Sequence, residues 1–135
     1  MHKEIIKAEL KTIDQVLLEL DQIIDETVAH NNFLGVFAYV YRRTTAEILK
    51  AVEENKFDDN SRMVEFDVAF ASLYLNAYQN YKKSKTVSLS WQKAFEYSHR
   101  KISVLQQILL GMNAHINLDL GVAAAYISEG KDINL

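Results

Sequence analysis

Residues 102–128 read ISVLQQILLGMNAHINLDLGVAAAYIS and contain no Lys, Arg or Glu. Apolar residues recur in this stretch at helical spacing, which predicts a stripe facing a protein core: Leu105, Leu109, Met112, Ile116, Leu120 and Ala123. Further apolar side chains fill the remaining angles of the helix: Val104, Leu110, Leu118 and Val122. A helix that is apolar nearly all round is buried on several sides or crosses a membrane.

Six polar residues interrupt this stretch: Gln106, Gln107, Asn113, His115, Asn117 and Asp119. Such frequent polar side chains argue against a membrane span. We therefore predict a central helix wrapped by other helices, which carries a polar cluster into the interior.

The whole chain has the composition of one soluble helical domain over residues 1–135. Of its 135 residues, 49% are hydrophobic and 24% are charged, so a sizeable core is expected. Proline is absent and there are only four glycines, which favours helices.

Charge and cysteine content exclude several classes of protein. The net charge of −3 argues against nucleic-acid binding. The absence of cysteine excludes disulfides and thiol chemistry and suits a reducing cytoplasm. Met1 is followed by alternating charges rather than by the apolar core of a signal peptide. A cytoplasmic location is therefore expected.

Polar breaks divide the chain into four main helices, predicted at about residues 2–29, 33–54, 60–81 and 90–128. The last of these is expected to bend or break around residues 98–103, because an unbroken helix would be far longer than the others. The predicted fold class is all-α: an up-and-down bundle of four main helices, with the nearly uncharged central helix buried innermost.

His115 and Asp119 are the main candidate site residues, because they lie four apart and share one face of the helix. Three roles fit them: two ligands of a divalent metal, a general acid–base pair, or a satisfied structural pair. Asp67 is the third candidate catalytic residue, since it falls on the apolar face of the third helix. An isolated carboxylate there is costly, so we expect these three side chains to converge.

Other polar residues are expected to complete the cluster. Asn113 and Asn117 form a second pair four apart, which predicts buried amides that clamp neighbouring helices. Asp67 or Asp119 is expected to pair with an arginine, and the candidates are Arg43, Arg42 and Arg62, in that order.

The motifs LQQILLGMNAHINLDLGVAAA (residues 105–125) and RMVEFDVAFASLYLNA (residues 62–77) resemble an uncharacterised bacterial family, domain of unknown function 5995. The resemblance covers about residues 33–135 and implies an all-helical fold without an established activity. It singles out a polar signature, which is Arg62, Asp67, Asn113, His115, Asn117 and Asp119. It also implies that family members continue beyond the last residue here.

A fainter resemblance links His115 and Asp119 to the HxxxD pair of the helical zinc phospholipase C and P1-type nuclease group. That group has a further histidine where this chain has Ala125, and a ligating N-terminal Trp where it has Met1. The resemblance therefore implies no trinuclear zinc site, and a smaller metal site stays open.

Two functional hypotheses remain, and the sequence leaves open whether the protein is an enzyme. One is a metal-dependent or acid–base hydrolase that acts on a small molecule at His115, Asp119 and Asp67. The other is a non-catalytic helical module in which the cluster fixes helix packing. The all-round apolar helix also predicts a homo-oligomer, or a C-terminal segment that covers one flank, because a lone monomer would expose a large apolar patch.

Overall fold

The computed structural model describes residues 10–129, and this part of the chain is all-α, with no β-strand among those residues. The elements in chain order are α2 (Ile13–Ala29), the short 3₁₀ helix η1 (Phe33–Gly35), α3 (Val36–Glu53), α4 (Asn60–Lys82), α5 (Leu89–Tyr97), α6 (Val104–Ala114), the π-helical turn η2 (His115–Asp119) and α7 (Leu120–Ser128). The predicted fold class is confirmed at this level.

Side-chain caps set the starts of the helices. Thr12 caps α2 and forms a reciprocal capping box with Gln15, so this helix begins at Ile13. Residues 10–12 are not helical, so the prediction of one helix over about residues 2–29 is wrong at these three positions. Residues 2–9 of that prediction lie outside the described part of the chain. Asp59 caps α4 and Ser88 caps α5.

The expected bend in the last predicted helix is confirmed as a complete break. The helix α5 ends at Tyr97, and α6 begins at Val104 after a second capping box, between Ser103 and Gln106. A serine that bonds the backbone of the third helical residue stabilises a new helix start rather than a continuation. The break therefore has a local cause in the sequence.

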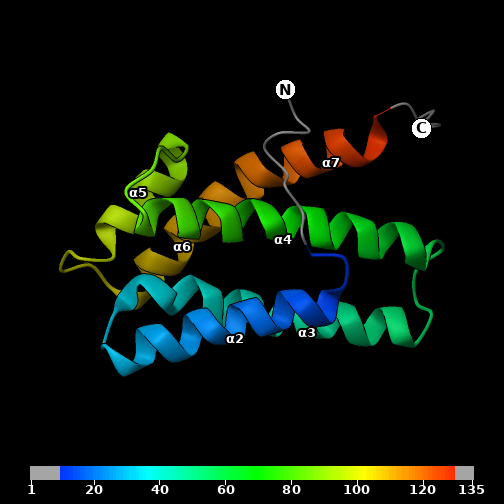
Figure 1. Ribbon diagram of the computed structural model, residues 1–135, viewed down its shortest axis with the longest axis horizontal. Coiled ribbons are helices and arrows are strands. Elements are labelled where there is room, and N and C mark those ends of the chain that lie inside the picture. The colour runs from blue at the N-terminus through cyan, green and yellow to red at the C-terminus, as the bar shows by residue number, and fades with distance from the viewer. Residues whose placement is uncertain (1–9, 130–135) are drawn as a thin grey trace.

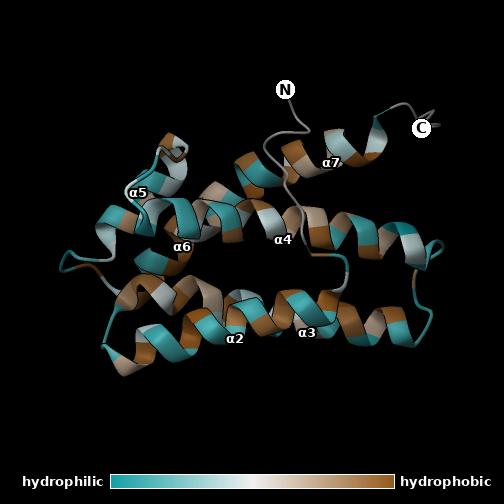
Figure 2. Ribbon diagram, in the orientation of Figure 1, coloured by the Kyte–Doolittle hydropathy of each residue, from teal (hydrophilic) through white to brown (hydrophobic). Residues whose placement is uncertain are grey.

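The helices α2 and α3 lie side by side, α4 packs beside them, and the α6–η2–α7 segment crosses behind α4 at an angle (Figure 1). Teal and brown residues alternate along α2, as expected of a helix with one buried face (Figure 2). The arrangement of the four main helices as one regular up-and-down bundle stays a prediction.

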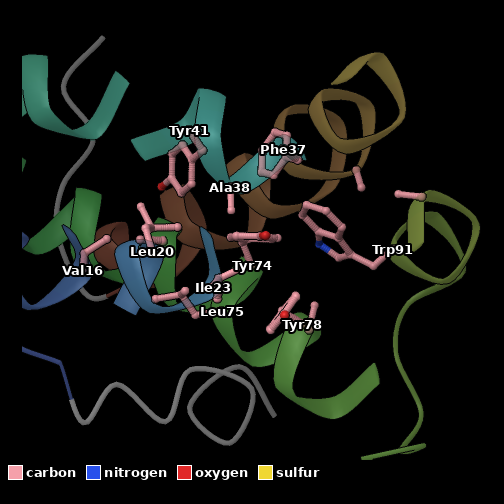
Figure 3. Packing of buried hydrophobic residues seen from close by; sticks show 14 of the residues in the cluster. Val16, Leu20, Ile23, Phe37, Ala38, Tyr41, Tyr74, Leu75, Tyr78 and Trp91 are labelled. Atoms are coloured by element: carbon pink, nitrogen blue, oxygen red, sulfur yellow. The ribbon is translucent and has the colours of Figure 1, made fainter. Parts of the chain in front are cut away.

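Aromatic side chains dominate the interior. Phe37 and Tyr41 from α3 lie against Tyr74 from α4 and Trp91 from α5, while Leu20 belongs to the aliphatic part contributed by α2 (Figure 3). Ring pairs at these distances contribute stability beyond the area that they bury. This aromatic cluster forms one wall of the candidate site described below.

The prediction that residues 102–128 form the innermost helix is wrong. The large side chains of the predicted inner stripe face outward, with Leu105 64% and Leu109 53% exposed, and Ile116 and Leu120 are exposed as well. The buried residues of α6 and α7 are instead small or polar: Gln107, Gly111, Ala114 and Ala123, together with Ile127. The segment lies at the edge of the helical assembly rather than at its centre.

Small side chains explain which face is buried. Gly111 lies directly beneath the Phe37 ring, since a Cβ atom built there would come within 2.5 Å of it. Ala114 and Ala123 are fully buried against the main core and against α4, respectively. Because the helix is apolar at almost every angle, periodicity does not select one face, whereas small residues allow α3 and α4 to approach closely.

We expect the Gly111→Ala variant to lose about 1–3 kcal/mol of unfolding free energy, because overpacking forces Phe37 from its position. Gly121→Ala is the matched control, since a Cβ atom there meets no atom within 4 Å and alanine favours the helix. Urea denaturation of both variants measures the difference. Equal stabilities of the two variants would show that the Phe37 contact is not tight.

Among residues 10–129, one helical stretch, Val104–Ser128, is long and apolar enough to cross a membrane by length and composition. Only 28% of its most apolar window is buried. The same stretch contains the buried polar residues His115 and Asp119, whose bonds to each other and to Trp91 tie it to α5.

Candidate functional site

The candidate site is centred on η2, a single π-helical turn between α6 and α7 that begins at His115 and ends at Asp119. Its two end residues are bonded to each other: His115 Nδ1 lies 2.9 Å from Asp119 Oδ2, and both side chains are buried. Single π-turns inside helices are rare and occur often at functional sites. This bond confirms the part of the predicted convergence that joins His115 to Asp119. The convergence of Asp67 with these two side chains stays a prediction.

Trp91 from α5 is the second partner of the same carboxylate. Its indole Nε1–H donates to Asp119 Oδ2 at 2.9 Å. Because the indole is always a donor, the Asp119 oxygen must accept. With a carboxylate facing its Nδ1, His115 carries the proton on that nitrogen, and Nε2 is the free one. The series Trp91–Asp119–His115 thus fixes both the orientation and the tautomer of the imidazole.

Aromatic rings enclose the imidazole. The ring of Phe70 stacks on His115 with centroids 3.7 Å apart and planes 5° apart. Tyr41 meets it edge-on at 4.5 Å, and Phe37, Tyr74 and Trp91 stand within 6.1 Å. His115 is therefore held in one position by packing on several sides, in surroundings of low polarity.

Several buried polar atoms around this ring make no hydrogen bond within residues 10–129: His115 Nε2, both carboxylate oxygens of Asp67, and the hydroxyls of Tyr41, Thr45 and Tyr74. Tyr41 links them, because the charges of both Asp67 and Asp119 act on its hydroxyl while its ring touches His115. Burial raises the pKa of the Tyr41 hydroxyl and the charge of Asp67 adds to this, whereas the nearby Thr45 hydroxyl offsets part of it. Neither hydroxyl reaches hydrogen-bonding geometry.

Unpaired polar groups in an interior are costly, so each one calls for an explanation. These six atoms belong to five residues on three elements, α3, α4 and η2. We call Tyr41, Thr45, Asp67, Tyr74 and His115 the inner polar chamber.

Burial shifts the two titratable groups of this chamber in opposite directions. It raises the pKa of Asp67 from 3.8 to about 7, because the carboxylate is taken out of water. It lowers the pKa of His115, because burial disfavours the imidazolium, and the hydrogen bond and charge of Asp119 offset part of that effect. Near neutral pH the chamber therefore combines a neutral imidazole with a carboxyl group that is only partly ionised.

The arrangement of these residues fits a metal site less well than an acid–base site. A catalytic zinc site needs about three protein ligands. Within residues 10–129, no group of three or more His, Asp or Glu side chains is placed to hold a metal ion. Asp119 does not point with His115 toward one ion, because its Oδ2 is bonded to the imidazole itself.

An open pocket of about 770 Å³ reaches Asp119 from outside. It lies between α4, α5 and the η2–α7 junction, and its polar lining includes Ser72, Asn76, Ser88 and Asp119. Asp119 therefore separates this pocket from His115 and the inner polar chamber.

The remaining predicted site residues lie elsewhere. Asn113 and Asn117 bond to each other at 2.7 Å but are exposed, so they do not clamp buried helices. Arg43 and Arg62 are exposed, and Arg42 pairs with Asp21 at 2.8 Å. The expected arginine partner is thus wrong: Asp119 accepts from Trp91 and His115, and Asp67 has no hydrogen-bond partner in the described part of the chain.

Sequence reasoning missed four residues of this site: Trp91, Tyr41, Thr45 and Tyr74. The three aromatic ones lie on apolar helical stripes, where an aromatic residue is expected to be core. The one available signal was that a buried indole N–H needs an acceptor and that Asp119 needs donors.

We expect the Trp91→Phe variant to lose about 1–3 kcal/mol of stability, because Asp119 loses a donor while most of the ring packing is kept. Trp91→Phe made in an Asp119→Asn background is the control, since the lost bond no longer involves a carboxylate. A double-mutant cycle by urea denaturation measures the coupling. Additive effects would contradict a Trp91–Asp119 bond of this strength.

Fold and site together define an all-α protein with a buried Trp–Asp–His series. Residues 13–134 match the model of a family of unknown function, DUF5995, so the chain belongs to that family, as the motifs around Asp67 and His115 predicted. No curated protein and no solved structure matches the chain.

Proposed function

We propose that the protein is an acid–base enzyme of the hydrolytic type that acts on a small polar molecule at His115. One observation carries the proposal: His115 Nε2 is buried without a partner in the described part of the chain, while Nδ1 is held by Asp119. A structural histidine would be expected to use both nitrogens, because an unpaired buried one is costly. A catalytic base needs one nitrogen fixed and the other free.

The opposed pKa shifts supply the second half of the chemistry. An acid and a base coexist at one pH when their surroundings push their pKa values apart. His115 is neutral and can take a proton from water as its oxygen attacks a carbonyl carbon. Asp67, with a pKa of about 7, can still donate a proton to the leaving oxygen. Asp119 and Trp91 act as positioning residues, because they hold the imidazole without touching substrate.

The surroundings restrict the substrate. Rings of Phe70, Tyr41 and Phe37 leave little space at His115, so we infer a substrate with a small acyl group. The pocket beside Asp119 opens to solvent, and Asp119 lies between it and His115, so a substrate reaches His115 from this pocket only when Asp119 moves. We also propose that α2, α3, α4 and the α6–η2–α7 segment form an up-and-down bundle around this site. We further propose that the enzyme acts in the cytoplasm.

Hydrolysis of p-nitrophenyl acetate tests the proposal. The wild-type protein should exceed an equal concentration of free imidazole and show saturation. The rate should rise with pH through a value below the ordinary histidine pKa of about 6.5, because burial favours the free base. A rate no greater than that of imidazole, over several short esters, would count against the enzyme.

A non-catalytic helical module is the second candidate, and the Trp91–Asp119–His115 series favours it specifically. These bonds tie α5 to the π-turn, so they also fix how the two elements pack. In that case His115→Gln would lower stability, by roughly 1–3 kcal/mol for a broken buried bond, with no effect on any hydrolytic rate.

A further inference from the structure

The outer face of α6, η2 and α7 carries a long row of exposed apolar side chains. Within the described residues these are Val104, Leu105, Leu109, Met112, Ile116 and Leu120. We call this row the apolar face. A patch this extended is unusual on a soluble monomer and marks a surface that another molecule covers.

The apolar face lacks charge along its whole length. From residue 102 to residue 128 the chain has no Lys, Arg or Glu, and its single Asp, Asp119, is buried. A partner with a charged surface would lose hydration on this face without gaining an ion pair. The covering surface must therefore be as uncharged as the face itself.

The same chain supplies one surface that meets this requirement. Val104–Ser128 is the only stretch in residues 10–129 that combines such length with so few charges. The outer sides of the other helices carry charges, as at Asp25 on α2, Arg43 on α3 and Arg62 on α4. A second copy related by a two-fold axis would place the uncharged face against itself.

We propose that the protein is a dimer in which the apolar faces of two copies pack against each other. The stretch has 25 residues, so the contact can extend over about 37 Å at 1.5 Å per residue. Two helices packed along most of that length can bury on the order of 1,000 Å², the lower range for a specific interface.

Two further features extend and orient this contact. An apolar groove of about 530 Å³ continues the face at the start of α6, where Val104 and Ile108 line it with Phe33 and Val36. Asn113 and Asn117, bonded to each other at 2.7 Å, lie exposed near the middle of the face. A polar pair within an apolar helix contact specifies register, because only one alignment satisfies its hydrogen bonds.

The mass of the full chain in solution tests the dimer. One chain has a mass of 15.5 kDa, so light scattering after gel filtration should give twice 15.5, which is 31 kDa. Leu109→Glu should reduce the mass to 15.5 kDa with an unchanged helical circular dichroism spectrum. Leu18→Glu is the matched control, because Leu18 is an exposed leucine on α2, 63% accessible, and its variant should stay a dimer.

A cross-link gives an independent readout, since the chain has no cysteine. Single-cysteine variants at the exposed positions Leu109, Met112, Ile116 and Leu120 should form disulfide dimers where the position lies nearest the two-fold axis, and Leu18→Cys should not. A monomeric wild type would overturn the proposal, as would a Leu109→Glu dimer. If the wild type instead bound neutral phosphatidylcholine vesicles through the apolar face, the covering partner would be a lipid surface, and the dimer proposal would be wrong. His115→Gln should stay dimeric, which separates this proposal from the enzymatic one.

Discussion

The His115→Gln variant is expected to hydrolyse p-nitrophenyl acetate about 10²–10⁴-fold more slowly than the wild type, the usual contribution of a positioned general base. Glutamine fills a similar volume between the side chains of Phe70 and Tyr41. It has no nitrogen that accepts a proton at neutral pH. Initial rates at saturating ester, measured between pH 5 and 8, give the loss.

His99→Gln is the matched control, because His99 is exposed and lies on the segment that links α5 to α6. Its rate should equal that of the wild type, which excludes catalysis by a surface imidazole. Asp119→Asn should reduce the rate less than His115→Gln does and change its pH dependence, as expected of a positioning residue. An unchanged rate in His115→Gln, together with a loss of stability, would favour the non-catalytic module.

The Asp67→Asn variant is expected to be more stable than the wild type at pH 8 and equally stable near pH 4. The pKa of Asp67 rises from 3.8 in the unfolded chain to about 7 in the folded protein, because burial disfavours the carboxylate. The native state therefore binds a proton that the unfolded state has lost, and stability falls as pH rises from about 4 to 7. At 1.36 kcal/mol for each pKa unit, the cost at pH 8 reaches at most about 4 kcal/mol.

Urea denaturation at pH 4 and pH 8 measures this effect, and asparagine is chosen because it has nearly the same shape without the charge. Asp58→Asn is the control, since Asp58 is exposed in the turn before α4. His115 works in the opposite sense: its lowered pKa makes the native state bind fewer protons, so stability decreases as pH falls below about 6.5. An Asp67→Asn gain of the same size at both pH values would show that Asp67 is not ionised by pH 8.

The short-range features of this protein followed from its sequence. Asn31 and Asn32 follow the end of α2, Asp59 caps the start of α4, and Ser88 caps the start of α5. Such caps and turns depend on only a few neighbouring residues. The His115–Asp119 pair was predictable for the same reason: residues four apart share one side of any helical turn. The capping box of Thr12 and Gln15 was also readable, and it would have placed the start of α2 correctly.

Long-range contacts decided the rest. The partner of Asp119 comes from Trp91, which is 28 residues away, and no local pattern connects the two. That Asp67 lies unpaired beside Tyr41, rather than bonded to an arginine, depends on how α3 and α4 pack. The π-turn at His115–Asp119 is a change of hydrogen-bond register that helical periodicity does not predict.

By itself, the sequence determined that residues 104–128 are helical and nearly uncharged and that they carry a His–Asp pair. Only the tertiary structure decided which side of that helix is buried. Hydrophobicity gives no preference when every side is apolar, so the choice depends on shape: Gly111 and Ala114 fit beneath α3, whereas Leu105 and Leu109 do not. The large side chains therefore face outward, while His115 and Asp119 lie in the interior beside the small ones.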